Sequence, residues 1–361
     1  MPERSRALRA ATYMQTDWFL VTTPDDVRWL TGFSCSTSTA LLSAEGEVHL
    51  LVDGRYDERA RDEARAAGVE VSVHRVKARG DVAGMIAGIV GSAVLGVDPA
   101  AVTLAVHDEF ASRVRVERTA SPCAGPRRVK DAGELQLIAR CAAVAGSALE
   151  TVVAEGLAGD TERGVRLRLD AAMLALGADE VSFPTIVASG PNGARPHHEP
   201  SGRTVAKGDL VVIDMGAAID GYRSDMTRTV RVGPVSPELE RMWHVVREAQ
   251  QAGLDTVRAG VPGKAVNSAV RAVFVAHGVE HEYLHGTGHG VGLVIHEQPI
   301  LGPACDTELL EGEVVTVEPG LYRGGTGGVR IEDLVVVTGS GCRILTGTPK
   351  DLPCPPSAPT T

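Results

Sequence analysis

The 361-residue sequence predicts an α/β domain over residues 1–125 and an α+β domain with an internal repeat over residues 126–346. Length alone favours more than one domain, because single hydrophobic cores stop growing at about 250–300 residues. In the first third, strand patterns alternate with helix patterns, which is typical of a largely parallel sheet covered by helices. In the remainder, two helices, a strand and a hairpin occur in the same order twice. The proline-rich residues 347–361 are expected to be disordered.

The first domain is predicted from short apolar segments separated by helical patterns. Strands are indicated by TDWFLVTT, TALL, EVHLLVD, VEVSVHRV, SAVLGVD and VRVERTA, and the second and third of these form a hairpin around Ala44-Glu45-Gly46. Helices are expected over residues 6–14, 56–67, 81–90 and 103–112, and PDDVRWLTGF is expected to be a proline-started helical turn that runs into a strand. No glycine fingerprint or phosphate loop follows a strand, so this domain carries little chemistry of its own. Asp53 and Arg55 could line an interface, although a solvated turn is the simpler interpretation.

The segment SPCAGPRRVKDAGE separates the two domains, because its prolines and glycine interrupt any regular pattern. Beyond it, apolar residues at helical spacing predict four long helices. These cover residues 132–156, 161–176, 237–259 and 264–277. Between the second and third helices lies SFPTIVASGPNGARPHHEP, which reads as a strand entering a loop that ends in two histidines.

The stretch GDLVVIDMGAAIDGYRSDMTRTVRV, residues 208–232, reads as a β-hairpin with an acid in each strand. If the loop is Ile219-Asp220, the acids Asp214 and Asp225 lie directly opposite each other. If the loop is Asp220-Gly221, they lie diagonally on the same face. Opposed side chains are about 5 Å apart, so two carboxylates would converge and repel unless a cation lay between them. A surface hairpin could also carry two unrelated aspartates.

A second pair of acids occupies the corresponding place in the repeat. Glu318 ends the apolar strand VVTVEPG as Asp214 ends VVID, and Glu332 in GVRIEDLVVV corresponds to Asp225. Alternation places Glu332 on the same face as Arg330, which could neutralise one acid but not four. Two halves packed face to face would bring four carboxylates into one cleft, where burial is costly without pairing or a metal.

His289 adds an imidazole to this set, because the glycines around it leave the backbone free to approach closely. One imidazole and four carboxylates, with no thiolate, suit two divalent cations of borderline hardness such as Mn²⁺, Co²⁺ or Zn²⁺. Two adjacent cations activate water and stabilise a tetrahedral intermediate. A single histidine in a glycine-rich loop is ordinarily incidental, but five such residues within one repeated unit are hard to explain separately.

Composition and motifs exclude several other classes of protein. The net charge is −10 and no basic stripe is present, so nucleic-acid binding is not expected. The six cysteines lack CxxC spacing, which fits a reducing compartment, and no signal peptide or membrane span of about 20 apolar residues is evident. We therefore expect a cytoplasmic protein that does not bind membranes. There is no GxSxG elbow and no HExxH helix, and Cys141 has no base nearby in the sequence.

Four segments together resemble the pita-bread metallopeptidases, the family of methionine aminopeptidase, prolidase and aminopeptidase P. They are IDMGAAIDGYRSDMTRT, HGTGHGVGLVIHE, TVEPGLY and GVRIED. PNGARPHHEP is similar to the substrate-side histidine loop of that family, and RRVKDAGELQLI to the first helix of its catalytic domain. VRWLTGF and VDGRYDERA resemble the creatinase-type amino-terminal domain that accompanies prolidase and aminopeptidase P. The similarity covers nearly the whole chain except the tail, and it implies the pita-bread fold for residues 126–346.

The resemblance implies a metal-binding role for each of the five candidate ligands. Asp214 would bind one metal through both carboxylate oxygens, and Asp225 and Glu332 would bridge two metals. His289 and Glu318 would complete the ligands of the second metal. Glu318 would also move a proton to or from the water between the metals.

The resemblance also implies roles in substrate binding and catalysis. His197 corresponds to a proton donor near the scissile amide, and His296 to a residue that stabilises the oxyanion. His285 corresponds to a histidine at the proline pocket, and Arg330 to an arginine that supports a metal-bridging acid. His198 matches no functional position of the family.

The implied activity is the hydrolysis of Xaa-Pro bonds with two divalent ions, of which Mn²⁺ is favoured. We favour the aminopeptidase P type, acting on peptides with proline second, because no identifiable residue closes the pocket behind proline. Prolidase, an Xaa-Pro dipeptidase, is the alternative, followed by a non-catalytic scaffold and a creatinase-like amidinohydrolase. Members of the family are usually homodimers, so a homodimer is implied.

Overall fold

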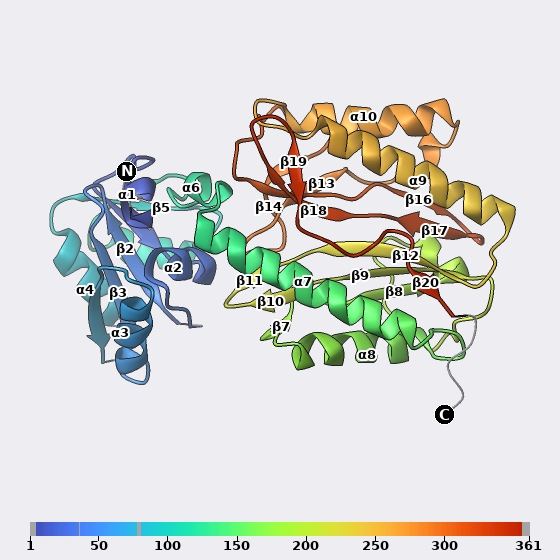
Figure 1. The fold of residues 1–361 in the computed structure, drawn as a ribbon. Helices are drawn as coiled ribbons and strands as arrows, with labels where there is room; N and C mark the ends of the chain where they lie inside the picture. Colours follow the sequence, from blue (N-terminus) through green and yellow to red (C-terminus); the bar gives the residue numbers. More distant parts are fainter. Residues whose placement is uncertain (1–4, 36, 78–80, 356–361) are drawn as a thin grey trace. The chain divides into compact units, whose positions relative to one another are not determined.

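The computed structural model describes residues 5–35, 37–77 and 81–355. The chain divides into two compact units, Met1–Arg127 and Arg128–Thr361, and each is built of β-sheet with helices packed on it (Figure 1). This division bears on where the chemistry lies, because the candidate metal ligands all belong to the second unit.

The first unit holds a six-stranded sheet in the order β4-β3-β2-β1-β5-β6. Its strands are β1 (Trp18–Val21), β2 (Thr39–Ser43), β3 (Val48–Asp53), β4 (Ser72–Val76), β5 (Val94–Val97) and β6 (Arg115–Arg118). The helices that accompany the sheet are α1 (Arg6–Ala11), α2 (Pro24–Thr31), α3 (Asp57–Ala66), α4 (Asp81–Val90), α5 (Leu104–Ala111) and α6 (Ala124–Arg128). Leu20, Leu41 and Leu51 of the sheet are buried in one core with Ile86 of α4.

The sheet is more mixed than the sequence pattern suggested. β1 is parallel to β5, β5 to β6, and β3 to β4, but β2 pairs antiparallel with both β1 and β3. The reason is the short β2–β3 connection, since a tight hairpin can join only antiparallel strands. Gly46, with φ of 88°, supplies the left-handed conformation of that turn.

The second unit contains the predicted repeat, and each copy has two helices followed by a sheet (Figure 1). The first copy comprises α7 (Ala132–Ala154), α8 (Glu162–Ala175), β7 (Glu180–Val181), β8 (Ile186–Ser189), η1 (Gly190–Ala194), β9 (Leu210–Met215), β10 (Ala217–Ile219), β11 (Tyr222–Arg223) and β12 (Met226–Val232). The second comprises α9 (Pro237–Thr256), α10 (Gly263–Ala276), η2 (Glu280–Glu282), β13 (Gly288–Gly290), β14 (Glu297–Leu301), β15 (Val314–Val317), β16 (Gly320–Arg323), β17 (Gly327–Arg330), β18 (Asp333–Val337) and β19 (Cys342–Ile344).

The two principal sheets of this unit share the arrangement of their central, acid-bearing strands. One has the order β20-β12-β9-β8, where β20 is Pro353–Cys354, and the other has the order β14-β13-β15-β18-β19. In both, an antiparallel pair carries the acids: β9 with β12, and β15 with β18. The internal repeat inferred from the sequence is therefore a structural repeat.

Local sequence accounts for where the helices of this unit begin. The Asp131 side chain caps α7 by accepting a hydrogen bond from the Glu134 amide, and the Glu134 side chain accepts one from the Asp131 amide. This reciprocal pair is a capping box. Thr161 and Ser236 cap α8 and α9 through their hydroxyl groups. These caps satisfy the first amide groups of each helix, which have no partner inside it.

Helix α7 also qualifies a prediction. No stretch was expected to suit a membrane span, yet α7, alone among the described helices, has the length and apolar composition of one. Of the 18-residue segment of α7 that meets these criteria, 56% is buried in the protein. Ala145, Leu149 and Val152 lie in a core with Val211 of β9. A buried core helix passes the same test of length and composition.

The predicted disordered tail is partly wrong. Within the described residues, Pro353 and Cys354 form β20, which pairs in parallel with Arg231 and Val232 of β12. Thr348 is buried, and its carbonyl oxygen accepts a hydrogen bond of 2.7 Å from Arg228 Nη2. The segment is ordered because its backbone adds an edge strand to the sheet beside β12. Proline is tolerated in edge strands, so a proline-rich composition does not exclude this pairing. Residues 356–361 lie outside the described part of the chain.

Candidate metal centre

The first hairpin settles the position of its two acids. Asp220 and Gly221 form the two-residue turn with φ of 52° and 79°, as a type I′ turn requires. This register places Thr227, not Asp225, directly opposite Asp214. The diagonal alternative is therefore the observed one, and Asp225 lies on the same face of the hairpin as Asp214.

The second hairpin brings its two acids face to face. Val317 pairs with Asp333 in one ladder, and Gly320 pairs with Arg330 in the next. The two ladders keep a single register, so Glu318 and Glu332, which lie between them, are directly opposed. The mutual repulsion of two opposed carboxylates is relieved most directly by a shared cation.

His289 reaches the acids because β13 approaches its neighbours closely. A Cβ atom on Gly288 would lie 2.0 Å from the carbonyl oxygen of Thr316, so only glycine fits there. The Nδ1 of His289 lies 3.1 Å from the carbonyl oxygen of Gly290, to which it donates. The other ring nitrogen, Nε2, is thereby left as the acceptor that a metal ion requires.

Three of the five predicted ligands form a compact cluster. Ligand atoms of Asp225, His289 and Glu332 all lie within 4.8 Å of one another. Glu318 adjoins the cluster, since its Oε1 is 3.4 Å from His289 Nε2. Asp214 is turned toward Arg330, with Oδ2 2.6 Å from Nη2.

The buried acids of the cluster are costly to ionise in the absence of a cation. Burial, together with the charges of neighbouring acids, raises the pKa of Asp225 and of Glu332 well above their ordinary values. The same burial raises the pKa of Glu318 to about 8 and lowers that of His289 to about 4. Metal ions reverse this cost by pairing with the ionised carboxylates.

The environment of one carboxylate oxygen, Asp214 Oδ1, indicates that the residues fit a metal ion. Asp214 Oδ1 is buried without a hydrogen-bond partner, although its sister oxygen is paired with Arg330. An unpaired buried carboxylate oxygen beside other acids is the position a metal ion would fill. The donors are carboxylate oxygens and one imidazole nitrogen, which suit Mn²⁺, Co²⁺ or Zn²⁺.

Arg330 supports the cluster through every nitrogen of its guanidinium. Nη2 donates to Asp214, Nη1 donates to the hydroxyl of Tyr322 at 2.8 Å, and Nε donates to Thr227 Oγ1 at 3.1 Å. Thr227 in turn donates to Glu332 Oε2 at 2.8 Å. One arginine thus orients an acid from each half of the repeat.

The remaining predicted residues lie around the cluster. The ring of His296 is 4.4 Å from that of His289, centroid to centroid. His285 Nε2 lies 2.8 Å from the Tyr322 hydroxyl, and burial, with the nearby charge of Arg330, lowers the pKa of His285 to about 4. His197 is exposed on the loop that follows η1.

Sequence reasoning missed four residues that shape the site. Thr227 and Tyr322 bind Arg330, and Thr316 donates to Glu318 Oε1 at 3.3 Å. The buried Glu162, far away in sequence, accepts a hydrogen bond from His198. Only Thr227 carried a signal, because it lies two residues after Asp225 on the same face of a strand.

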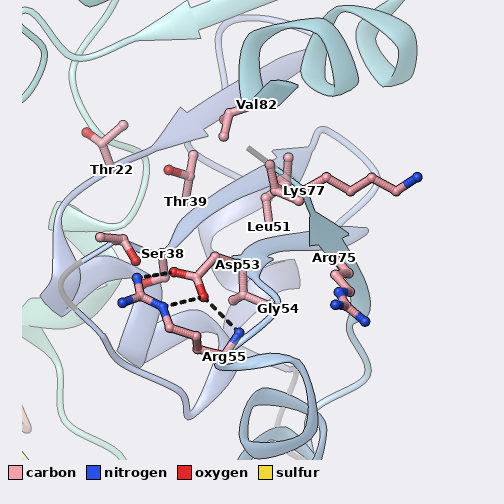
Figure 2. Close-up of a pocket in the computed structure, with 13 residues that line it drawn as sticks. Thr22, Ser38, Thr39, Leu51, Asp53, Gly54, Arg55, Arg75, Lys77 and Val82 are labelled. Atoms are coloured by element: carbon pink, nitrogen blue, oxygen red, sulfur yellow. Dashed lines mark hydrogen bonds and ion pairs between the residues drawn. The ribbon is translucent and has the colours of Figure 1, made fainter. Parts of the chain in front are cut away.

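A cavity in the first unit offers a contrast. It has a volume of about 880 Å³ and lies where β3 and β4 end. Its one acid, Asp53, is paired with Arg55 at 2.7 Å, and Figure 2 shows Lys77 extending away from that pair. Asp53 and Arg55 lie in the solvent-exposed turn predicted for them, and among the described residues this cavity lacks the grouped donors that a metal requires.

The fold and the buried cluster of acids and histidine define a divalent-metal-dependent hydrolase. The chain belongs to metallopeptidase family M24, whose model matches residues 136–339, and residues 4–127 match the creatinase/prolidase N-terminal domain. The resemblance inferred from the motifs is thus confirmed, as is the pita-bread fold.

Individual relatives agree on the class of peptidase and differ in type. The chain is 34% identical to an uncharacterized peptidase, YqhT, of Bacillus subtilis over 93% of this chain and 95% of that protein. It is 32% identical to an Xaa-Pro dipeptidase from Bacillus anthracis, with a TM-score of 0.90 over 96% of this chain and 98% of that one. An X-Pro aminopeptidase from Thermotoga maritima is 33% identical, with a TM-score of 0.87 over 95% and 99% of the two chains.

Proposed function

We propose that this protein hydrolyses Xaa-Pro bonds in the manner of aminopeptidase P, releasing the first residue of peptides with proline second. The observation that carries the choice is the engagement of Arg330. A dipeptidase must bind the carboxylate that follows proline, whereas each nitrogen of this buried cation already donates to Asp214, Tyr322 or Thr227. A substrate that continues beyond proline has no such carboxylate to bind.

Asp214, Asp225, His289, Glu318 and Glu332 would hold two divalent ions, with Mn²⁺ the preferred metal. Bound at these residues, such ions lower the pKa of water and stabilise negative charge on the substrate carbonyl. The chain contributes the fixed geometry: Arg330 and Thr227 orient the acids, and the Nδ1 contact of His289 selects its tautomer.

The remaining residues would serve proton transfer and substrate orientation. Glu318, whose Oε1 lies 3.4 Å from His289 Nε2 in the cluster, would exchange a proton with the attacking water. His197 would donate the proton that the proline nitrogen needs on leaving, since an exposed imidazole can exchange protons with water. His296 would donate to the oxyanion. His285 remains neutral near pH 7 and would face the proline ring.

An Xaa-Pro dipeptidase is the second candidate, favoured by the relatives that carry that description. They include the Bacillus anthracis protein and one from Pyrococcus furiosus that is 38% identical over 226 residues, 65% of its length. We also propose a homodimer, because members of this family are usually homodimers. Light scattering of the purified protein would test it. The six free cysteines support a cytoplasmic location.

The test compares an Xaa-Pro dipeptide with the tripeptide that adds one residue after proline, each with added Mn²⁺. We expect the tripeptide to be hydrolysed with the higher kcat/KM. A preference for the dipeptide would establish the dipeptidase instead. Hydrolysis of neither, with metal bound, would favour a binding scaffold, and hydrolysis of creatine alone would reveal an amidinohydrolase.

A further inference from the structure

The buried carboxylate of Glu162 collects an unusual number of hydrogen bonds for a residue outside the metal centre. Glu162 is fully buried in the first turn of α8. Oε1 accepts from the amide and hydroxyl of Ser189, both at 2.8 Å, and from Asn192 Nδ2 at 3.0 Å. Oε2 accepts from the hydroxyl and amide of Ser201 at 2.6 and 3.0 Å, and it lies 2.8 Å from His198 Nε2.

These partners span both ends of one loop. Ser189 ends β8, Asn192 lies in η1, and His198 and Ser201 follow on the return. The backbone adds to the attachment, because the Glu162 amide donates to the carbonyl of Arg203 at 3.0 Å. Both ends of the loop formed by residues 189–201 are therefore hydrogen-bonded to the same carboxylate. His197 lies in this loop, near its second end.

The opposite side of the loop rests on the metal centre. Arg330 Nη1 lies 3.3 Å from the carbonyl oxygen of Pro196, the residue before His197. Gly193 packs so closely on β17 that a Cβ atom would lie 3.0 Å from the amide nitrogen of Gly328. The loop is held between Glu162 on one side and the arginine that orients Asp214 on the other.

We propose that Glu162 is a positioning residue for catalysis: it fixes the 189–201 loop so that His197 faces the scissile bond. This inference rests on the proposed function, in which His197 donates a proton. His198 matched no functional position of the family. Its hydrogen bond to Glu162 holds it inside the protein, so that the adjacent His197 points outward. His198 is buried and bound to Glu162, whereas the adjacent His197 is exposed.

The Glu162 carboxylate is ionised near neutral pH. Burial raises the pKa of Glu162, but hydrogen bonds from Ser201, Ser189, Asn192 and His198 outweigh it and lower the pKa to about 2. The carboxylate therefore remains an acceptor near neutral pH, and any effect of replacing Glu162 should not follow its own titration.

The test uses Glu162→Gln, which keeps the size of the side chain but replaces one acceptor oxygen with a donor amide group. The new NH2 group would then face a backbone amide, that of Ser189 or of Ser201, donor to donor, and its other partners would have to turn to accept. We expect faster amide hydrogen exchange in peptides covering residues 186–203 and a kcat about 10–100-fold lower with KM changed less than threefold. Glu134→Gln is the matched control, because Glu134 is also buried in a first helical turn and accepts from the Tyr222 hydroxyl at 2.8 Å. It should leave exchange in residues 186–203 unchanged.

A double-mutant cycle separates positioning from general destabilisation. If Glu162 acts through His197, Glu162→Gln should lower kcat by no more than about twofold in a His197→Ala background. Equal effects in both backgrounds, or unchanged exchange in residues 186–203, would overturn the inference. Hydrogen exchange needs no turnover, so it still reports on the loop if the wild-type protein cleaves no Xaa-Pro peptide, which is the failure of the proposed function.

Discussion

Removing the metal should make the stability of this protein depend on pH in an unusual direction. Glu318 has a pKa of about 8 in the metal-free folded state, against an ordinary value of 4.5. Between these values the folded state binds more protons than the unfolded state, so the free energy of unfolding falls as pH rises. His289, whose pKa is lowered to about 4 from 6.5, acts in the opposite direction only below pH 6.5. The informative window is therefore pH 6.5 to 8.

The magnitude follows from the partial ionisation of Glu318 over that window, which is half complete at pH 8. One pKa unit corresponds to about 1.4 kcal/mol, so ionising Glu318 should cost the metal-free protein roughly 2 kcal/mol between pH 6.5 and 8. Asp225 and Glu332, also with raised pKa, add in the same direction. Urea unfolding after treatment with a chelator, at constant ionic strength, measures the difference.

Two controls make the prediction specific to the cluster. Glu318→Gln should remove most of this pH dependence, because the amide does not titrate. Added Mn²⁺ should raise the stability of the wild-type protein more at pH 8 than at pH 6.5, since ionised carboxylates bind it. A metal-free protein equally stable at both pH values, or a Glu318→Gln variant with an unchanged slope, would refute the reasoning.

Three substitutions test the supports of the site. Gly288→Ala places a methyl group 2.0 Å from the Thr316 carbonyl oxygen and should displace His289, which metal analysis after dialysis would show as substoichiometric Mn²⁺. Arg330→Lys loses the fork that joins Asp214 and Thr227, so Mn²⁺ affinity measured by calorimetry should fall about 10–100-fold. Asp333→Ala strands the guanidinium of Arg228, each side chain being 1% exposed, and should cost about 3–5 kcal/mol in urea unfolding. Unaltered metal content, affinity or unfolding, respectively, would contradict these expectations.

The metal centre was predictable because its residues obey local rules. Asp214 and Asp225 share a hairpin whose period-two alternation fixes their face, and only the turn position was left open. The choice of Asp220-Gly221 depends on the positive φ angles of the turn, which a residue type permits but does not impose. The second copy of the pattern then supplied Glu318 and Glu332 at matching positions.

The parts that were missed depend on contacts between distant segments. Glu162 binds Ser201 across 39 positions of the chain, and nothing in the sequence around Glu162 distinguishes it from an ordinary first-turn acid. Tyr322 gains its role only because β16 and β17 fold it against Arg330. Similarly, β20 pairs because β12 offers it an edge, which composition does not reveal.

The central claim is that the buried acids and His289 hold metal ions that drive Xaa-Pro hydrolysis. The most direct test measures Mn²⁺-dependent cleavage of an Xaa-Pro tripeptide by Asp225→Ala beside Asp220→Asn. Asp220 lies in the exposed turn of the same hairpin, and asparagine tolerates its positive φ. We predict that Asp225→Ala abolishes metal-dependent cleavage and that Asp220→Asn retains it. Full activity of Asp225→Ala would contradict the claim.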